Sequence, residues 1–348
     1  NNPLLISIIS ANIGTMQLIA TLFCIKINNS NRPNFIFNTC MLLCALIAII
    51  TGFCFDNGFV TLFAITYLLE MLILEIFSGY HYAYTYHSLP EDQAMIVHSK
   101  RISLFKVLQA LGIALAGFIC SQFIKNTFLI IAILVTIVFG LTMLLVTQVK
   151  NFPKVQEKKR TNLIKKLNIF QYTNYFRKWF IIRFLVRFSL SSLIVLLSLK
   201  VIDKGQSLFA LKTVKSILWI LSGIGFFLSS CFIKKRIMVK GDILVKSLVA
   251  ILLLVVFIYP NIVFLIILLT GIVNPFNTMS NLEMLRKDKD TITTPQKEMV
   301  INLAGYLAKI IASYILLNIN RDLALIIIAL LLVISVILEY RLYNKTKD

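Results

Sequence analysis

Two carboxylates, Glu70 and Glu75, lie inside a long apolar run that continues as EMLILEIFSGYHYAYTYHS from Glu70 to Ser88. An ionisable side chain inside a hydrocarbon layer costs about 2.5–3.5 kcal/mol on insertion scales. Such residues are therefore usually paired, turned towards a cavity or functional. A carboxyl group in this position can take up and release a proton as its surroundings change.

A second apolar run carries a polar stripe. Thr270, Asn274, Asn277 and Asn281 recur at i, i+4, i+7 and i+11, which places them on one face of a helix. A stripe of this kind faces water or protein rather than lipid. It marks this helix as a candidate for binding a polar solute.

The two runs are related by an internal repeat. Under a shift of 196 residues, the last three members of the stripe fall on three polar residues of the first run: Ser78, His81 and Thr85. Glu70 continues that face towards the outside of the membrane. Glu75 is rotated from Glu70 by about 140°, so we expect it to meet a neighbouring helix. Two interpretations stay open for these carboxylates: a solute or proton role, or simple neutralisation of basic groups.

Basic side chains also lie within apolar segments. Arg183 and Arg187 are one turn apart; snorkelling to the inner interface explains Arg183, whereas Arg187 lies deeper and suits either a cavity or an ion pair. Lys309 lies near the middle of its segment, on one face with Asn302, Tyr306 and Ser313. Lys106 lies shallower in its segment, and Lys246 can snorkel as Arg183 can. With these two we count five embedded basic residues against two acidic ones. This surplus favours an anionic or amphiphilic solute.

The elements that must position these residues are membrane-spanning helices. The chain is 58% hydrophobic and 14% charged, with a mean hydropathy of +0.86 over 348 residues, which excludes an ordinary soluble globular protein. A span needs about 20 apolar residues. Eleven segments are predicted to qualify: 3–27, 35–53, 59–83, 101–123, 128–146, 180–199, 213–233, 243–259, 262–285, 299–317 and 323–340.

The distribution of Lys and Arg predicts the orientation. With the N-terminus outside and the C-terminus inside, 24 of the 35 basic residues fall in cytoplasmic loops or the inner tail. The net charge of +20 therefore requires no nucleic-acid partner. The six Cys all fall within predicted spans or, for Cys54, directly beside one, and they show no metal-type spacing, so we expect neither a metal site nor a cofactor.

A long basic loop divides the chain. We predict an N-terminal half bundle at 1–149 with five spans, a cytoplasmic linker at 150–179 and a C-terminal half bundle at 180–348 with six spans. The linker mixes Lys and Arg with Ile, Leu, Phe and Tyr, which suits either a solvated connection or a helix on the anionic inner leaflet. The shift of 196 residues also lays ALAGFI (Ala114–Ile119) on IIASYI (Ile310–Ile315) and LPEDQ on LRKDK. These matches indicate two pseudo-repeated halves.

On these features the chain resembles a major facilitator superfamily transporter, a family with two six-helix halves joined by a long cytoplasmic loop. The resemblance extends from the family's second helix to its twelfth, so that the first helix is expected to be missing from this sequence. The family's loop motif is represented by CIKINNSNRPN (Cys24–Asn34), in which only Lys26 and Arg32 agree, and its antiporter signature by GIALAG (Gly112–Gly117). The resemblance implies that the third, sixth and ninth spans line a central cavity.

The resulting expectation is an all-α polytopic bundle that moves a small solute by alternating access, coupled to protons and directed outward, with no catalytic residues. One alternative is a transport-inactive sensor or accessory protein, and another is a membrane enzyme acting on lipid. Expected partners are the solute, protons and the bilayer. The abundance of Ile, Asn and Lys indicates an AT-rich bacterial genome and hence the cytoplasmic membrane.

Overall fold

The computed structural model describes a helical chain, with no strand in the described part. It describes residues 11–22, 33–89, 93, 96–104, 106, 107, 110, 130, 133, 136, 137, 169–203, 208–232, 238–288 and 294–344. Within these, the side chains at 33, 34, 37, 55, 60, 78–88, 202, 203, 208–212, 215, 229, 230, 232, 286 and 294–296 are not described.

Contacts between residues group the chain into two compact units. The first contains Asn1–Ala11, Met95–Ala114 and Asn162–Asp348, and the second contains Asn12–Ala94 and Leu115–Thr161. Two serines connect the segment at 95–114 to α8 (Leu208–Phe232) of the first unit. Ser99 donates a hydrogen bond to the carbonyl of Phe226 at 2.5 Å, and Ser103 donates one to the carbonyl of Gly223 at 2.7 Å. The sequence places this segment in the N-terminal half bundle at 1–149, and that division stays a prediction.

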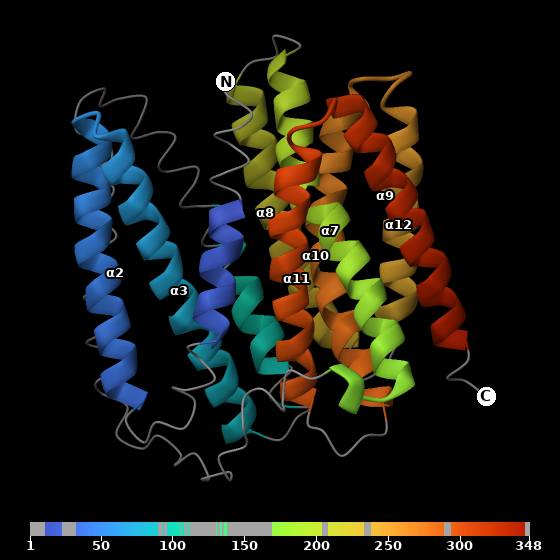
Figure 1. The fold of residues 1–348 in the computed structure, drawn as a ribbon, viewed down its shortest axis with the longest axis horizontal. Helices are drawn as coiled ribbons and strands as arrows, with labels where there is room; N and C mark the ends of the chain where they lie inside the picture. The colour runs from blue at the N-terminus through green and yellow to red at the C-terminus, as the bar shows by residue number, and fades with distance from the viewer. Residues whose placement is uncertain are drawn as a thin grey trace. The chain divides into compact units, whose positions relative to one another are not determined.

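The second unit contains a helical hairpin made of α2 (Pro33–Asp56) and α3 (Val60–Ser88). The chain reverses at Gly58, whose φ of 73° lies in the left-handed region that glycine enters without steric conflict. The N–H of Phe59 donates to the carbonyl of Cys54 at 2.9 Å, which satisfies one end carbonyl of α2. This turn lets the two apolar helices pack as neighbours (Figure 1).

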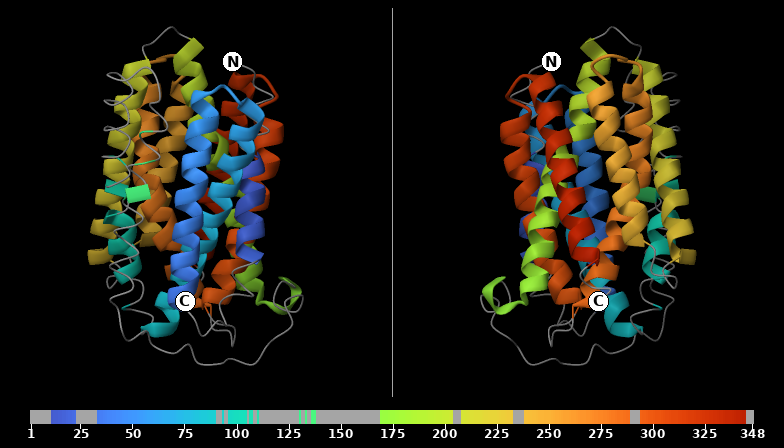
Figure 2. Two further views of the ribbon diagram at one scale, coloured as in Figure 1. Left: turned by 90° about the vertical axis from the view of Figure 1, so that its left-hand side faces the viewer. Right: turned by 90° about the vertical axis from the view of Figure 1, so that its right-hand side faces the viewer.

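Six helices carry the described part of the first unit from Asn174 onward: α7 (Asn174–Asp203), α8 (Leu208–Phe232), α9 (Met238–Val255), α10 (Ile262–Lys287), α11 (Thr294–Leu316) and α12 (Arg321–Asn344). Helix α7 packs against α11 and α12, α9 packs against α10 and α12, and α8 packs against α10. The right-hand view in Figure 2 shows helices of this unit running side by side, among them yellow-green α7 and red α12. Their buried apolar residues, such as Leu193, Leu253 and Ile328, form a continuous core between them.

The helices follow the predicted spans closely. Each of the eight spans that lie largely within the described residues coincides with one helix, with ends that differ by a few residues. The predicted spans at 3–27, 101–123 and 128–146 fall largely outside the described residues. In the described part, four helices are long and apolar enough to cross a membrane: Asn174–Val201, Ile262–Leu285, Lys297–Leu316 and Arg321–Asn344.

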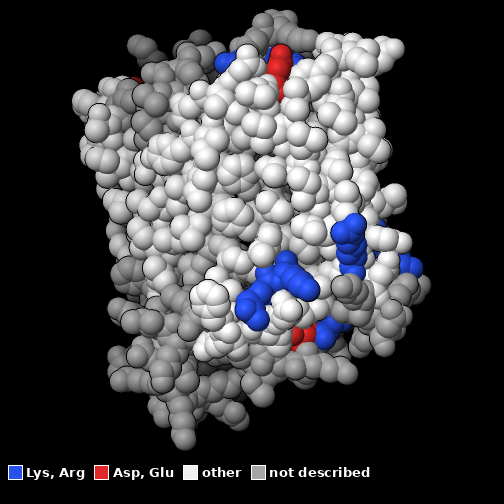
Figure 3. Space-filling view, turned by 45° about the vertical axis from the view of Figure 1, so that its right-hand side comes forward, with Lys and Arg blue, Asp and Glu red and all other residues white. Residues whose placement is uncertain are grey.

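The outer surface of these helices is apolar. Large hydrophobic side chains are exposed along them, among them Leu244, Ile251, Leu330 and Ile337. On the face in Figure 3, basic side chains gather towards one end of the bundle, a small charged group lies at the other end, and the belt between them is uncharged. This pattern is that of a bundle whose belt contacts lipid.

Helix α7 begins within the last part of the predicted linker, 150–179. Helix α7 already begins at Asn174, because Thr173 Oγ1 accepts the N–H of Phe176 at 3.0 Å and so caps the helix. Thr173 Oγ1 also donates to Asp288 Oδ1 at 2.6 Å, and Asp288 pairs with Lys297 at 2.7 Å. These contacts tie the first turn of α7 to the segment between α10 and α11. Residues 150–168 of the predicted linker lie outside the described residues.

A carboxylate caps α9 from another helix. Glu283 Oε2, near the end of α10, accepts the N–H groups of Met238 at 3.0 Å and Val239 at 3.3 Å. These are two of the N–H groups that a helix leaves without an internal partner at its start. The ends of α9 and α10 are thereby fixed to each other at the same end of the unit as Thr173 and Asp288.

Candidate functional site

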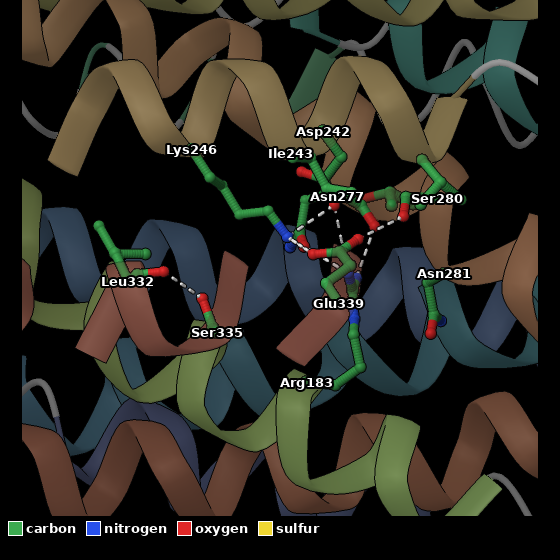
Figure 4. Close-up of polar contacts among 12 residues, drawn as sticks. Arg183, Asp242, Ile243, Lys246, Asn277, Ser280, Asn281, Leu332, Ser335 and Glu339 are labelled. Carbon is green, nitrogen blue, oxygen red and sulfur yellow. Dashed lines mark hydrogen bonds and ion pairs between the residues drawn. The ribbon is translucent and has the colours of Figure 1, made fainter. Parts of the chain in front are cut away.

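Four charged side chains meet inside the first unit: Arg183 on α7, Asp242 and Lys246 on α9, and Glu339 on α12 (Figure 4). Lys246 Nζ lies 2.9 Å from Asp242 Oδ2 and also binds Glu339 Oε2. Ser280 Oγ of α10 donates to the other carboxylate oxygen of Glu339 at 3.1 Å. Two positive and two negative charges balance each other here, and we call these four residues the charge cluster.

Arg183 joins the charge cluster to α10. Its Nη1 donates to Asn277 Oδ1 and its Nη2 donates to the carbonyl of Asn277 at 2.5 Å, while Asp242 Oδ2 lies 3.7 Å from Nη1. Only 2% of the Arg183 side chain is exposed, and Lys246 is fully buried. Snorkelling was therefore the wrong interpretation for both residues, because each charge is matched by a partner inside the protein rather than by interfacial water.

The charge cluster also corrects the count of embedded charges. Asp242 and Glu339 are completely buried, and Glu283 and Glu298 are buried as well. The apparent surplus of five basic residues over two acidic ones omitted all four of these carboxylates. A sequence signal existed for Glu339, which lies inside an apolar run. Asp242 stands four residues before Lys246, on the edge of its predicted span.

The polar stripe of α10 packs largely against α7. Asn281 Oδ1 accepts the indole N–H of Trp179 at 2.8 Å, and Asn277 holds Arg183 as described above. Thr270 is buried and donates to the carbonyl of Ile267 at 2.6 Å within its own helix. Asn274 is half-buried, and its side-chain amide makes no hydrogen bond within the described part of the chain. The stripe thus faces protein at its inner end, whereas the side chain of Asn274 has hydrogen-bonding groups that no described residue uses.

The two other predicted basic site residues lie at mid-helix. Arg187 is half-buried on α7, one turn beyond Arg183, and packs against Gly305 of α11. Lys309 is half-buried on α11, one turn beyond Gly305, and has a polar or electrostatic partner of its own. Because α7 and α11 pack on each other, both residues belong to one region of the first unit.

The carboxylates of α3 have different surroundings. Glu75 Oε1 accepts a hydrogen bond from the Gln17 amide at 2.6 Å, so it meets a neighbouring helical segment that includes residues 11–22. Glu70 is half-buried, and its carboxyl group interacts electrostatically with Cys44 of α2 and with Tyr67. Within the described residues of its unit, Glu70 has no hydrogen bond and no ion pair. Neither carboxylate neutralises a basic residue there.

Three predicted site residues have no described side chains. Ser78, His81 and Thr85 lie on the helical backbone of α3, and their side chains are outside the described residues. Their place on the face of Glu70 therefore stays a prediction from helical spacing. No geometry of a bound solute follows from them.

Comparison with known proteins identifies the family. The family model of the Major Facilitator Superfamily matches residues 2–288. A search of curated protein sequences finds no match. Three solved structures are similar in fold. The human organic anion transporter MFSD10 is 14% identical, with 96% of this chain and 83% of that chain covered and a TM-score of 0.67. The E. coli fucose:proton symporter FucP in the outward conformation is 13% identical, with coverages of 98% and 90% and a TM-score of 0.63, and the proton:xylose symporter XylE is 14% identical, with coverages of 98% and 86% and a TM-score of 0.71.

Fold and family agree with each other. The similar structures cover nearly the whole chain, and the family model matches well over half of it. The helices of the structure are those that a polytopic transporter requires. The chain belongs to the Major Facilitator Superfamily, a family of membrane solute transporters.

Proposed function

We propose that this protein carries a small solute across the cytoplasmic membrane of a bacterium by alternating access, in the outward direction and coupled to protons. The family supports solute transport. Two of the structurally similar proteins are described as proton symporters, which supports proton coupling in this fold. A carboxyl group placed where it can gain and lose a proton during the cycle is then required.

The observation that carries the proposal is the state of Glu70. It lies within the apolar helix α3, half-buried, with no hydrogen bond or ion pair among the described residues of its unit. A carboxylate held for structural reasons inside a membrane helix is normally paired, because the unpaired charge is expensive in hydrocarbon. Glu75 differs, since the Gln17 amide already hydrogen-bonds to it. Glu70 is therefore the carboxyl group we assign to proton binding.

The test uses the full chain in proteoliposomes with a pH gradient. A panel of labelled sugars, organic acids and amphiphilic dyes is screened for gradient-driven movement, and the active solute is then followed in variants. Glu70→Gln should abolish gradient-driven movement while solute exchange without a gradient persists, because glutamine keeps the shape and hydrogen bonding but cannot ionise. The measurement is the initial rate of each process.

A matched control removes a carboxylate elsewhere. Asp322, in the first turn of α12, is 61% exposed and pairs with Lys200, so Asp322→Asn should leave both processes intact. Gradient-driven movement by Glu70→Gln at the wild-type rate would reject the proton role. Absence of movement for every solute with the wild-type protein would favour the transport-inactive alternative.

A further inference from the structure

Arg187 occupies an unusual position in the first unit. Helix α7 has 30 residues, and Arg187 is its fourteenth (187 − 174 + 1), so it stands near the middle of a helix about 45 Å long. It lies within the apolar span Asn174–Val201. The backbone of Arg187 therefore lies near the middle of the span, at the depth where an unpaired charge costs most free energy.

This guanidinium has no hydrogen-bond or ion-pair partner within the described part of the chain. Arg187 makes no hydrogen bond and no ion pair there, whereas Arg183, one turn away, has Asn277 and Asp242. The charge cluster cannot supply a counter-ion, because its two carboxylates already balance Arg183 and Lys246. An arginine kept at this level without a counter-ion indicates a water-filled or ligand-filled space at its tip.

The stem of Arg187 is held by close packing. A Cβ atom at Gly305 of α11 would lie 3.3 Å from Arg187 Cγ and 3.6 Å from its Cδ, so the glycine leaves the room that the stem occupies. The neighbouring Tyr306 interacts with Arg187 electrostatically. The contact between α7 and α11 therefore fixes the base of the side chain and leaves its charged end to be satisfied by something else.

Two side-chain amides, those of Asn274 and Asn302, lie at about the depth of Arg187 in the helix bundle. Helices α7 and α10 run in opposite directions, and Arg183 of α7 binds Asn277 of α10. Arg187 lies one turn after Arg183, and Asn274 lies about one turn before Asn277, so both lie on the same side of this contact along the two helices. Asn302 stands one turn before Tyr306 on α11. Both asparagines are half-buried, and within the described residues neither side chain has a hydrogen bond. The three helices that carry these groups all pack on one another.

We propose that Arg187 binds the carboxylate of an organic monoanion, with Asn274 and Asn302 as hydrogen-bonding partners, and that this anion is the transported solute. A guanidinium presents a rigid fork of donors that matches a carboxylate, and the amides add neutral donors. One guanidinium balances one negative charge, which selects a monoanion. This inference rests on the proposed transport function and names its solute class.

The test compares carboxylates with their neutral counterparts. Thermal unfolding of the purified full chain is followed in detergent with lactate, benzoate and glucuronate, each set against its amide. At least one carboxylate should raise the Tm by several degrees while its amide does not, because a ligand that binds only the folded state stabilises it. Arg187→Gln should abolish that shift. Arg341→Gln, the same change at an exposed residue of α12, should retain it.

The possible results separate the proposals. No stabilisation by any of the three carboxylates, or a shift that persists in Arg187→Gln, would overturn the carboxylate assignment. Stabilisation by the amides alone would overturn it too, yet would leave solute transport standing, since a neutral solute would then bind. Gradient-driven flux, measured separately, decides the transport proposal itself.

A structural role for Arg187 predicts a different result without ligand. If Arg187 had a hidden partner, Arg187→Gln would lower the Tm as Arg183→Gln must. The latter leaves Lys246 as the only basic residue of the charge cluster beside two buried carboxylates and breaks the hydrogen bonds to Asn277. We expect instead that Arg187→Gln leaves the Tm of the ligand-free protein unchanged or raises it, since an uncompensated charge has been removed. An equal loss of Tm in both variants would contradict the proposal.

Discussion

At the scale of single residues, the embedded charges of the charge cluster differ from those of Arg187 and Glu70. Arg183, Asp242, Lys246 and Glu339 compensate one another completely inside the first unit. Arg187 and Glu70 have no ion pair within the described residues of their units. A compensated cluster stabilises one arrangement of helices, whereas an uncompensated charge requires water, a proton or a ligand. We therefore expect the charge cluster to have a structural role and Arg187 and Glu70 to have functional ones.

Breaking the charge cluster should be costly. Lys246→Met leaves the buried carboxylates of Asp242 and Glu339 facing each other, and we expect a loss of about 3–5 kcal/mol in the free energy of unfolding. Adding Glu339→Gln should restore part of the loss, because it removes one stranded charge and keeps an acceptor for Ser280. Denaturation of the purified proteins measures both effects.

The surface pair Lys200–Asp322 provides the control for this experiment. Asp322 is 61% exposed, so its ion pair with Lys200 is screened by solvent. Lys200→Met should therefore change the free energy of unfolding by less than about 1 kcal/mol. A loss for Lys246→Met no larger than that of Lys200→Met would show that the charge cluster contributes nothing to stability.

At the scale of elements, the crossing of α8 and α10 depends on small residues. A Cβ at Gly271 would lie 2.6 Å from the backbone carbonyl oxygen of Leu218, and one at Gly225 would lie 2.6 Å from Cγ of Pro275. Such distances mean that the two backbones approach as closely as glycine allows. Pro275 lies inside α10, so the crossing involves a helix that has also lost one internal hydrogen bond.

Gly271→Ala should destabilise the protein by about 1–3 kcal/mol, because a backbone atom of α8 must move to admit the methyl group. Gly305→Ala is the matched comparison. Its methyl would meet only the flexible Arg187 stem at 3.3 Å, and alanine favours the helix by up to about 1 kcal/mol over glycine. Thermal unfolding should therefore show a loss for the first variant and little change for the second; equal losses would contradict the close crossing.

The helices were predictable from the sequence, and their side-chain partners were not. Apolar runs place α10 and α12 within a few residues, because the thickness of the bilayer sets the length of the run. The early start of α7 depends on Thr173 and its distant partner Asp288, which no local pattern reveals. The stripe on α10 was visible in the sequence, but that Asn277 binds Arg183 follows only from how α7 packs against α10.

At the scale of the whole molecule, the charge distribution should set the orientation in the membrane. In the first unit, Lys240, Lys287, Lys297 and Arg341 stand at the helix ends that also carry Asp288 and Glu283, and Lys200 and Asp322 stand at the opposite ends. Because basic residues are in excess at the former ends, we expect these ends to face the cytoplasm. The turn between α11 and α12, with the exposed Asn318, is then outside.

Labelling of introduced cysteines tests this orientation. Asn318→Cys, at the exposed turn, should react with a membrane-impermeant maleimide on intact cells, whereas Lys240→Cys, exposed at the start of α9, should react only after the cells are opened. The unaltered chain, in which Cys40, Cys44 and Cys54 are buried and Cys231 is exposed, gives the background for each condition. Because short-loop charge determines orientation, the reverse labelling pattern would show that the protein faces the other way and would turn the proposed outward transport into uptake.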